Sequence, residues 1–293
     1  MEEERQFIER VKRDILYGHD IAPPVVDVEK CTGCGLCVKV CPSLVFKLDE
    51  KKSTIIRGEG CNACGQCWAV CPEEAVSQQD AATATTLKPG PAPAVPPDTL
   101  QLLLRERRST RLFTDEPVSR EHLLRIIEAG RYAPTGSNRQ KIDYVIVSGQ
   151  EKVAELRSLV ETFMEKMFEA AQNDVMRYYA LGYRNCKEGG KKNAYFPFPY
   201  GSAAIIAHTQ SSDATAPFNC AAALFSGSLM AHSLGLGTCF VGFVQTGASV
   251  DKRIRDWLGI PEGNQSYAAM VVGHPDVTYR RLVERRSPEV TWR

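Results

Sequence analysis

The sequence predicts a two-part α+β protein in which a small cysteine-rich domain precedes a larger layered domain. Eight of the 11 cysteines lie between Cys31 and Cys71. Beyond a Pro- and Ala-rich stretch at residues 77–98, apolar patterns of helical and strand spacing alternate. A chain of 293 residues has room for about two domains. We therefore expect a cysteine-rich domain over residues 1–76, a linker over 77–98 and an α+β domain over 99–293.

The charge balance and the absence of long apolar runs exclude several classes of partner. The 36 Lys and Arg residues nearly balance the 35 Asp and Glu residues, so the chain lacks the cationic excess needed to bind nucleic acid or an anionic membrane. The acidic start MEEER does not resemble a signal peptide, and no apolar run approaches the roughly 18 residues of a membrane span. We expect a cytoplasmic protein, where clustered cysteines more often bind metal or carry electrons than form disulfides.

The first domain is expected to begin with an amphipathic helix and to continue with a repeated cysteine motif. Apolar residues recur at helical spacing between Phe7 and Leu16. The motif C-x2-C-x2-C-x3-C-P then occurs twice, with each cysteine repeated 30 positions later. Thiolates at this spacing converge on an iron-sulfur cube, and the fourth cysteine of each run ligates the other cluster. The predicted ligands are Cys31, Cys34, Cys37 and Cys71 for cluster one, and Cys61, Cys64, Cys67 and Cys41 for cluster two.

Two four-cysteine zinc sites are the alternative reading of this motif. Zinc sites usually have two C-x2-C pairs separated by a longer loop, whereas here three closely spaced cysteines are followed by a fourth before a proline. Residues 25–76 resemble the bacterial two-cluster [4Fe-4S] ferredoxins. The resemblance implies one-electron transfer through two [4Fe-4S] clusters.

The second domain is expected to alternate helices and strands. Ser119 is placed to cap a helix that runs through Ile127, and residues 221–234 are apolar on every side, which predicts a central helix. Cys220 and Cys239 lie in apolar segments and are expected in the core. Further helices are predicted over residues 100–107, over most of 150–185 and around Trp257, and strands over 144–147, 203–207, 240–244 and 268–272.

Three loops of this domain carry residue types suited to a flavin nucleotide. The segment 107–111, RRSTR, offers three guanidinium groups and two hydroxyls to a phosphate. The loop 133–140 supplies carboxamides that can donate to and accept from the edge of a heterocycle. Glycines in the segment 234–243 permit close approach of the backbone to a ligand.

These three segments, in this order, resemble the FMN-dependent nitroreductase family over about residues 100–293. The resemblance implies an FMN-binding α+β sandwich and a homodimer, in which the C-terminal segment 289–293 reaches over the partner. FMN phosphate and ribityl contacts would come from Arg107, Arg108, Ser109 and Arg111, and from Arg281 and Arg285 in the tail. The flavin would be lined from the other subunit by Pro134, Thr135, Gly136, Asn138 and Gln140, and its N5 would face the backbone amides of Val241 and Gly242.

The two halves together predict an FMN-dependent oxidoreductase that is recharged through the clusters. Its substrate would be a small planar electrophile such as a nitroaromatic, a quinone or an activated alkene, and its donor a ferredoxin or another redox protein. The resemblance leaves open whether NAD(P)H binds over the flavin. No side chain is identified as a catalytic proton donor, and His232 is expected to be a structural histidine. The alternative is a carrier that passes electrons from NAD(P)H or the flavin to a protein partner.

The segment 163–200 is expected to roof the substrate pocket. Its aromatic residues either stack on a planar ligand or pack the helices of the roof itself, and the sequence does not choose between these. They are Phe168, Tyr178, Tyr179, Tyr183, Tyr195, Phe196 and Phe198.

Overall fold

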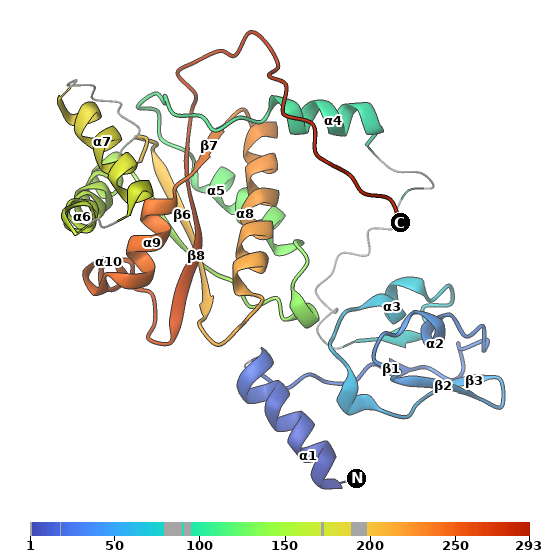
Figure 1. Cartoon of the computed structure of the whole chain (residues 1–293). Coiled ribbons are helices and arrows are strands. Elements are labelled where there is room, and N and C mark those ends of the chain that lie inside the picture. Colours follow the sequence, from blue (N-terminus) through green and yellow to red (C-terminus); the bar gives the residue numbers. More distant parts are fainter. Residues whose placement is uncertain (1, 18, 79–89, 91–94, 171–172, 189–197) are drawn as a thin grey trace. The chain divides into compact units, whose positions relative to one another are not determined.

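The computed structural model describes residues 2–17, 19–78, 90, 95–170, 173–188 and 198–293 (Figure 1). It divides into two compact units. Unit 1 comprises residues 1–91 together with 135–141, and unit 2 comprises 92–134 together with 142–293. Most of the predicted linker lies outside the described residues, although Ser77 ends a strand and Pro97 begins a helix. The assignment of 135–141 to unit 1 has no counterpart in the sequence pattern.

Unit 1 consists of short elements that follow the cysteine repeat. It opens with the helix α1, and Tyr17 ends the π-helical turn that follows. The predicted amphipathic helix is therefore present, although Phe7 and Ile15 are more than half exposed. The remaining elements are β1 (Val25–Val26), α2 (Leu36–Val40), β2 (Phe46–Asp49), β3 (Lys52–Ile55), α3 (Gln66–Val70) and β4 (Val76–Ser77), with α1 spanning Glu2–Val11.

The two halves of the cysteine repeat fold alike. Each places its first three cysteines in a loop and the start of a short helix, and Gly35 and Gly65 precede these helices with φ of 73° and 72°. Only glycine adopts this left-handed conformation without steric cost, which explains the glycine at both positions. The strands form two antiparallel pairs, β1 with β4 and β2 with β3. Val45 and Phe46 pack with the cysteines in the small core.

Unit 2 is a four-stranded antiparallel sheet covered by helices on both faces (Figure 1). The strand order is β5-β6-β8-β7, and the register between β6 and β8 shifts between Ala207 and His208. The strands are β5 (Asp143–Ser148), β6 (Ala203–Gln210), β7 (Gly237–Phe240) and β8 (Asn264–Gly273). The helices are α4 (Pro97–Glu106), α5 (Arg120–Arg131), α6 (Gln150–Glu169), α7 (Asp174–Glu188), α8 (Ala216–Ser233), α9 (Gly242–Val250) and α10 (Lys252–Leu258).

The alternation of side chains along β6 and β8 creates two cores. Ala204 and Ile206 point to the face covered by α6, α9 and α10, whereas Ala203 and Ile205 point to the face covered by α5 and α8. Both faces are buried, so these strands are apolar at almost every position. Cys220 and Cys239 are 0% and 2% exposed, which confirms that both are core residues. Burial raises the pKa of Cys220 to about 12.

Two predicted elements differ in the structure. The strand predicted over 240–244 is wrong, because the chain leaves β7 at Phe240 and begins α9 at Gly242. Val241, Val244 and Ala248 are buried at intervals of three and four residues, which is helical spacing that the short apolar run concealed. Helix α8 starts five residues before the predicted 221, and it is not buried all round, since Phe218 and Phe225 are 62% and 42% exposed.

The cap predicted for α5 is confirmed. The Ser119 hydroxyl accepts a hydrogen bond from the His122 N–H at 3.1 Å. This bond satisfies one of the backbone amides left free in the first helical turn. Within the part of the chain that the structure describes, no helix is long and apolar enough to cross a membrane.

A buried histidine makes the stability of the unit 2 sheet depend on pH. His208 is 4% exposed, and its Nδ1 lies 3.1 Å from the Asn264 amide nitrogen. Burial lowers the pKa of His208, and the charge of Asp143 opposes this more weakly. The unfolded chain therefore binds the proton first as pH falls below about 6.5, and the sheet loses stability from there downward. We expect the hydrogen-exchange protection factors of β6 and β8, which correct for the slower intrinsic exchange at lower pH, to fall between about pH 7.5 and 5.5, and to fall less in His208→Gln. An equal fall of the protection factors in both proteins would assign the effect to other groups.

Candidate cofactor sites

Four cysteines of unit 1, from both halves of the cysteine repeat, surround a small cavity. The cavity has a volume of about 20 Å³, and its wall includes Cys31, Cys34, Cys37 and Cys71. Three of these cysteines come from the first run, and the fourth is the last cysteine of the second run. The fold thus brings together the crossed ligand set predicted for cluster one.

The other four cysteines form the matching group. Cys61 and Cys67 are buried, and burial raises the pKa of both thiols. The charges that act on Cys67 are those of Cys61, Cys64 and Cys41, so these four sulfurs lie within electrostatic reach of one another. A buried thiolate is unfavourable without a cation, and coordination to iron removes this cost because the metal holds the thiol deprotonated. This set is the one predicted for cluster two.

Backbone amides point at the sulfurs in the same way in both halves. Val45 N–H lies 3.3 Å from the Cys41 Sγ, and Ala75 N–H lies 3.3 Å from the Cys71 Sγ. In each case the donor comes four residues after the fourth cysteine of its run. Amides directed at sulfur stabilise a thiolate ligand and tune the potential of a bound cluster. The thiols and the amides directed at them therefore have the donor chemistry that iron-sulfur clusters require, although among the described residues no three such side chains are arranged to hold a single metal ion.

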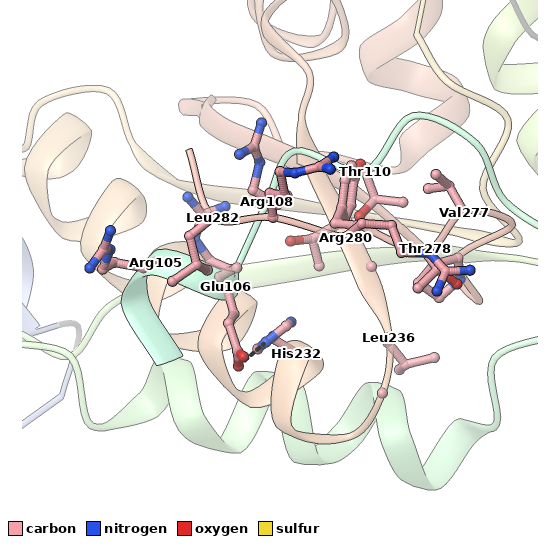
Figure 2. Close-up of a pocket in the computed structure, with 17 residues that line it drawn as sticks. Arg105, Glu106, Arg108, Thr110, His232, Leu236, Val277, Thr278, Arg280 and Leu282 are labelled. Carbon is pink, nitrogen blue, oxygen red and sulfur yellow. Dashed lines mark ion pairs between the residues drawn. The ribbon is translucent and has the colours of Figure 1, made fainter. Parts of the chain in front are cut away.

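Unit 2 contains a basic cavity of about 500 Å³ (Figure 2). Three segments that are distant in the sequence form its wall: the end of α4 with the residues after it, the turn between α8 and β7, and the C-terminal segment after β8. The cations in this wall are Arg105, Arg107, Arg108, Arg280 and Arg281. Of these, Arg105 is paired with Glu284. A concentration of guanidinium groups in one cavity suits an anionic ligand.

Arg107 is the clearest sign that an anion belongs in this cavity. Its Nε is buried and has no hydrogen-bond partner among the described residues. Burial lowers the pKa of Arg107, and the charges of Arg285 and Arg108 lower it further. Cations that repel one another in a half-buried site are unfavourable unless an anion accompanies them. A bound phosphate would satisfy the donors and remove the repulsion.

Close backbone contact positions the segment 107–111. Thr110 N–H donates to the Thr238 carbonyl at 2.9 Å, and Ser109 forms a bridge with the same residue. The contact needs glycine at 237, because a Cβ there would lie 2.7 Å from the Thr110 side chain. The segment therefore runs beside β7 and presents Arg107 and Arg108 to the cavity.

The residues predicted for FMN contact are not all in this cavity. Arg107, Arg108 and Arg281 line it. Ser109 and Arg111 do not, and Arg111 donates to the Ser109 carbonyl at 3.2 Å. Arg285 is outside the wall, although its charge acts on Arg107.

The other predicted flavin contacts lie elsewhere. Thr135, Gly136, Asn138 and Gln140 belong to the 135–141 segment of unit 1, and Pro134 directly precedes it. The Val241 N–H donates to the Ala269 carbonyl at 2.9 Å and is therefore used in the sheet. Gly242 begins α9 with open space around its Cα, because a Cβ there would meet nothing within 4 Å.

Two residues of the basic cavity, Tyr279 and Arg280, are not among those predicted from the sequence. Arg280 and Tyr279 line the cavity, and the ring of Tyr279 lies 5.4 Å from the Arg108 guanidinium carbon. The pair of arginines at 280 and 281 was the available signal. His232 also lines the cavity, and its Nε2 lies 3.8 Å from Glu106 Oε2 (Figure 2).

The aromatic residues of the predicted roof pack mainly on one another. The rings of Phe168 and Tyr183 lie 5.8 Å apart, and Phe168 also contacts Phe243 of α9. The Tyr183 hydroxyl lies 2.7 Å from both Glu161 and Glu165. Phe198 is 1% exposed, whereas Tyr178 is 73% exposed. Tyr195 and Phe196 lie outside the described residues. For Phe168, Tyr183 and Phe198 the structure therefore shows packing of the fold.

Comparisons with known proteins match the two parts of the chain to two different families. A family model described as the nitroreductase family matches residues 104–274, which is more than half of the chain. The chain belongs to the nitroreductase family. A second family model, described as a 4Fe-4S dicluster domain, matches residues 23–72. The chain is therefore an oxidoreductase in which a nitroreductase domain is fused to an iron-sulfur ferredoxin domain.

Individual relatives are distant. The chain is 26% identical over 174 residues to a Bacillus subtilis protein named FMN reductase [NAD(P)H], covering 59% of this chain and 64% of that protein. A solved nitroreductase with bound FMN from Bacteroides fragilis superposes with a TM-score of 0.52 at 21% identity, covering 66% of this chain and 98% of that one. An FMN-dependent nitroreductase from Clostridium difficile gives 0.52 at 19% identity, covering 65% and 97%. These structures show that unit 2 has the nitroreductase fold.

Proposed function

We propose that this nitroreductase-family chain binds FMN and reduces a small planar electrophile with electrons delivered through two [4Fe-4S] clusters. The observation that carries the proposal is the buried Arg107 Nε, which lacks a partner among the described residues, in a cavity rich in arginine. A phosphate ester is the anion that such a cavity fits. The cysteine sets of unit 1 supply the single-electron carriers.

The phosphate of FMN would be held by Arg107, Arg108 and Arg281, with Arg285 adding charge from outside the wall. Ser109 and Arg111 would hold the ribityl chain from the same segment. The amide of Gly242 remains the proposed donor toward N5, because that of Val241 is used by Ala269. When bound, FMN supplies the redox chemistry, since it takes up electrons singly and gives them to a substrate as a hydride.

The second part of the proposal is a homodimer. Phe218 and Phe225 of α8 are exposed, and Trp292 in the C-terminal segment is 90% exposed. Exposed aromatic side chains on a helix that is otherwise apolar are typical of a surface that another chain covers. We place the homodimer contact on this face of α8, with the segment 289–293 reaching over the partner.

The domain limits and the cellular site are proposed as the sequence predicts them. The ferredoxin domain would occupy residues 1–76, the linker 77–98 and the flavin domain 99–293. We place the protein in the cytoplasm, where cysteine thiols stay reduced and available to clusters. The electron donor would be a ferredoxin or another redox protein that meets the exposed Cys34 side of unit 1.

Anaerobic stopped-flow reduction of the full-length holoprotein tests the direction of electron flow. A reduced low-potential ferredoxin should bleach the cluster absorbance first and the flavin absorbance afterwards, because the clusters accept one electron at a time and pass it on. NADH and NADPH serve as the comparison donors in the same experiment. Adding nitrobenzene or a quinone should then reoxidise the flavin before the clusters.

The opposite order would contradict the proposal. If NADPH reduces the flavin first and the clusters follow, the chain is an electron carrier that passes electrons outward to a protein partner. If the flavin is reduced while the clusters stay oxidised throughout, the clusters have no part in the reaction.

A further inference from the structure

The loop that holds cluster two is covered by a segment from the other half of the chain. Within unit 1, the Asn138 side-chain amide donates to the carbonyl of Asn62 at 3.1 Å and to that of Ala63 at 3.0 Å. These two peptides join Cys61 to Cys64, which are two of the ligands of cluster two. Both Asn138 bonds are partly buried. The segment 135–141 is thus bonded to the backbone immediately beside the cluster.

Further contacts of unit 1 hold this segment in a specific conformation. The Tyr17 hydroxyl donates to the Ser137 carbonyl at 2.9 Å, and Gln140 N–H donates to the Thr135 hydroxyl at 3.0 Å. Ser137, Asn138 and Gln140 have φ of 53°, 53° and 52°. Three left-handed residues other than glycine within four positions are unfavourable, and the surrounding contacts must stabilise them.

Comparison of the two cysteine repeats shows which contact of the first repeat is replaced in the second by the segment 135–141. In the first repeat, the corresponding loop is covered by the turn between β2 and β3. Lys52 Nζ donates to the Cys31 carbonyl, and a Cβ on Gly33 would lie 1.9 Å from the Lys51 carbonyl oxygen. In the second repeat, the residue in the place of Gly33 is Ala63, and its cover is Asn138. The second half of the ferredoxin domain therefore uses part of the flavin-domain sequence as its cover.

The two cluster sites also differ in exposure. Cys34 is exposed, whereas Cys64, the equivalent residue 30 positions later, is only partly exposed. Lys12 is buried next to the second repeat, where its Nζ donates to the Glu59 carbonyl at 2.9 Å. Cluster one is thus the site that an external protein can approach, and cluster two is the site enclosed by this chain.

We propose that cluster two is the cluster that gives its electrons to FMN, and that Asn138 is the residue that positions its ligand loop. The proposal rests on the proposed function and adds the order donor, cluster one, cluster two, FMN. Each transfer oxidises cluster two by one electron. Two transfers and one proton from solvent reduce FMN by an electron pair.

The test compares Asn138→Leu with the unchanged holoprotein. Leu is close to Asn in size and removes both donated hydrogen bonds. Hydrogen exchange in residues 61–65 should become about tenfold faster, as expected for the loss of two neutral hydrogen bonds. After rapid reduction of the clusters by a viologen radical, the flavin that remains bound should be reduced several times more slowly, with cluster content unchanged and the rate taken per bound FMN. Tyr17→Phe should shift both readouts in the same direction by less.

Asn185→Leu on the exposed face of α7 is the matched control and should leave the exchange of residues 61–65 unchanged. The proposal is overturned if Asn138→Leu changes neither readout, or if it releases FMN while exchange in residues 61–65 stays the same. The second result would make Asn138 a flavin ligand only. If the clusters of the unchanged protein do not reduce the flavin at all, the proposed function fails. In that case the exchange measurement still reports separately whether Asn138 holds the loop.

Discussion

Replacing Arg107 with Ala should give a protein that keeps its iron and sulfide and loses most of its FMN on purification. The guanidinium is half-buried, its Nε has no partner among the described residues, and its positive charge is opposed by Arg285 and Arg108. A hydrogen bond to a charged group contributes about 1.5–3 kcal/mol, which corresponds to a roughly 10- to 150-fold weaker Kd. The FMN-free form should not be destabilised, because the substitution removes a repelled cation.

The measurement is FMN fluorescence after release by heat, normalised to protein, together with a titration of the FMN-free form. Arg131→Ala is the matched control, because Arg131 lies on the exposed surface of α5 and is paired with Glu128 at 2.6 Å. Full retention of FMN by Arg107→Ala would remove this residue from the phosphate site. A large loss of thermal stability without FMN would show a structural role instead.

Replacing Cys41 with Ser should destroy cluster two and leave cluster one. Serine offers an oxygen where the iron of a cluster requires a soft thiolate. Iron should fall from about eight to about four atoms per chain. Cys71→Ser should have the same effect on total iron and should remove cluster one, because Cys71 lines the cavity with Cys31, Cys34 and Cys37.

Double variants decide whether the ligand sets are crossed. If Cys41 and Cys64 hold the same cluster, the pair Cys41→Ser and Cys64→Ser should lose no more iron than either change alone. The pair Cys41→Ser and Cys34→Ser should lose both clusters. Uncrossed ligation predicts the reverse pattern, so iron and sulfide analysis of the two double variants separates the models. Magnetic resonance spectra of the reduced proteins would identify the surviving cluster.

Local patterns were sufficient to predict most elements of the fold. The serine cap of α5 and the buried strands β6 and β8 could be read from residue type and spacing, because each depends on interactions within a few residues or on burial of both faces. The strand predicted after β7 is wrong because an apolar run of four or five residues fits a strand and a helix equally well. The exposed face of α8 is not predicted, because apolar residues on every side of a helix indicate burial on every side, whereas Phe218 and Phe225 are exposed in this chain.

The candidate cysteine ligands and the arginine segment could also be predicted from the sequence alone. The spacing of the cysteines carries its own geometry, since thiolates two residues apart on a tight loop can meet one cluster. The segment 107–111 contains three arginines, so its basic character does not depend on how it packs. The sequence by itself therefore determined the two kinds of domain that the family models match, and it named the candidate side chains for each.

Only the tertiary structure decided how these groups are combined. It joined the end of α4 to residues 275–282 in one cavity, and it left the Arg107 Nε without a hydrogen-bond partner among the described residues. It also placed Asn138 on the backbone of Asn62 and Ala63, which are about 75 positions earlier in the chain. Contacts between such distant segments have no periodic signature in the sequence, because they depend on the packing of whole elements and the closure of long loops.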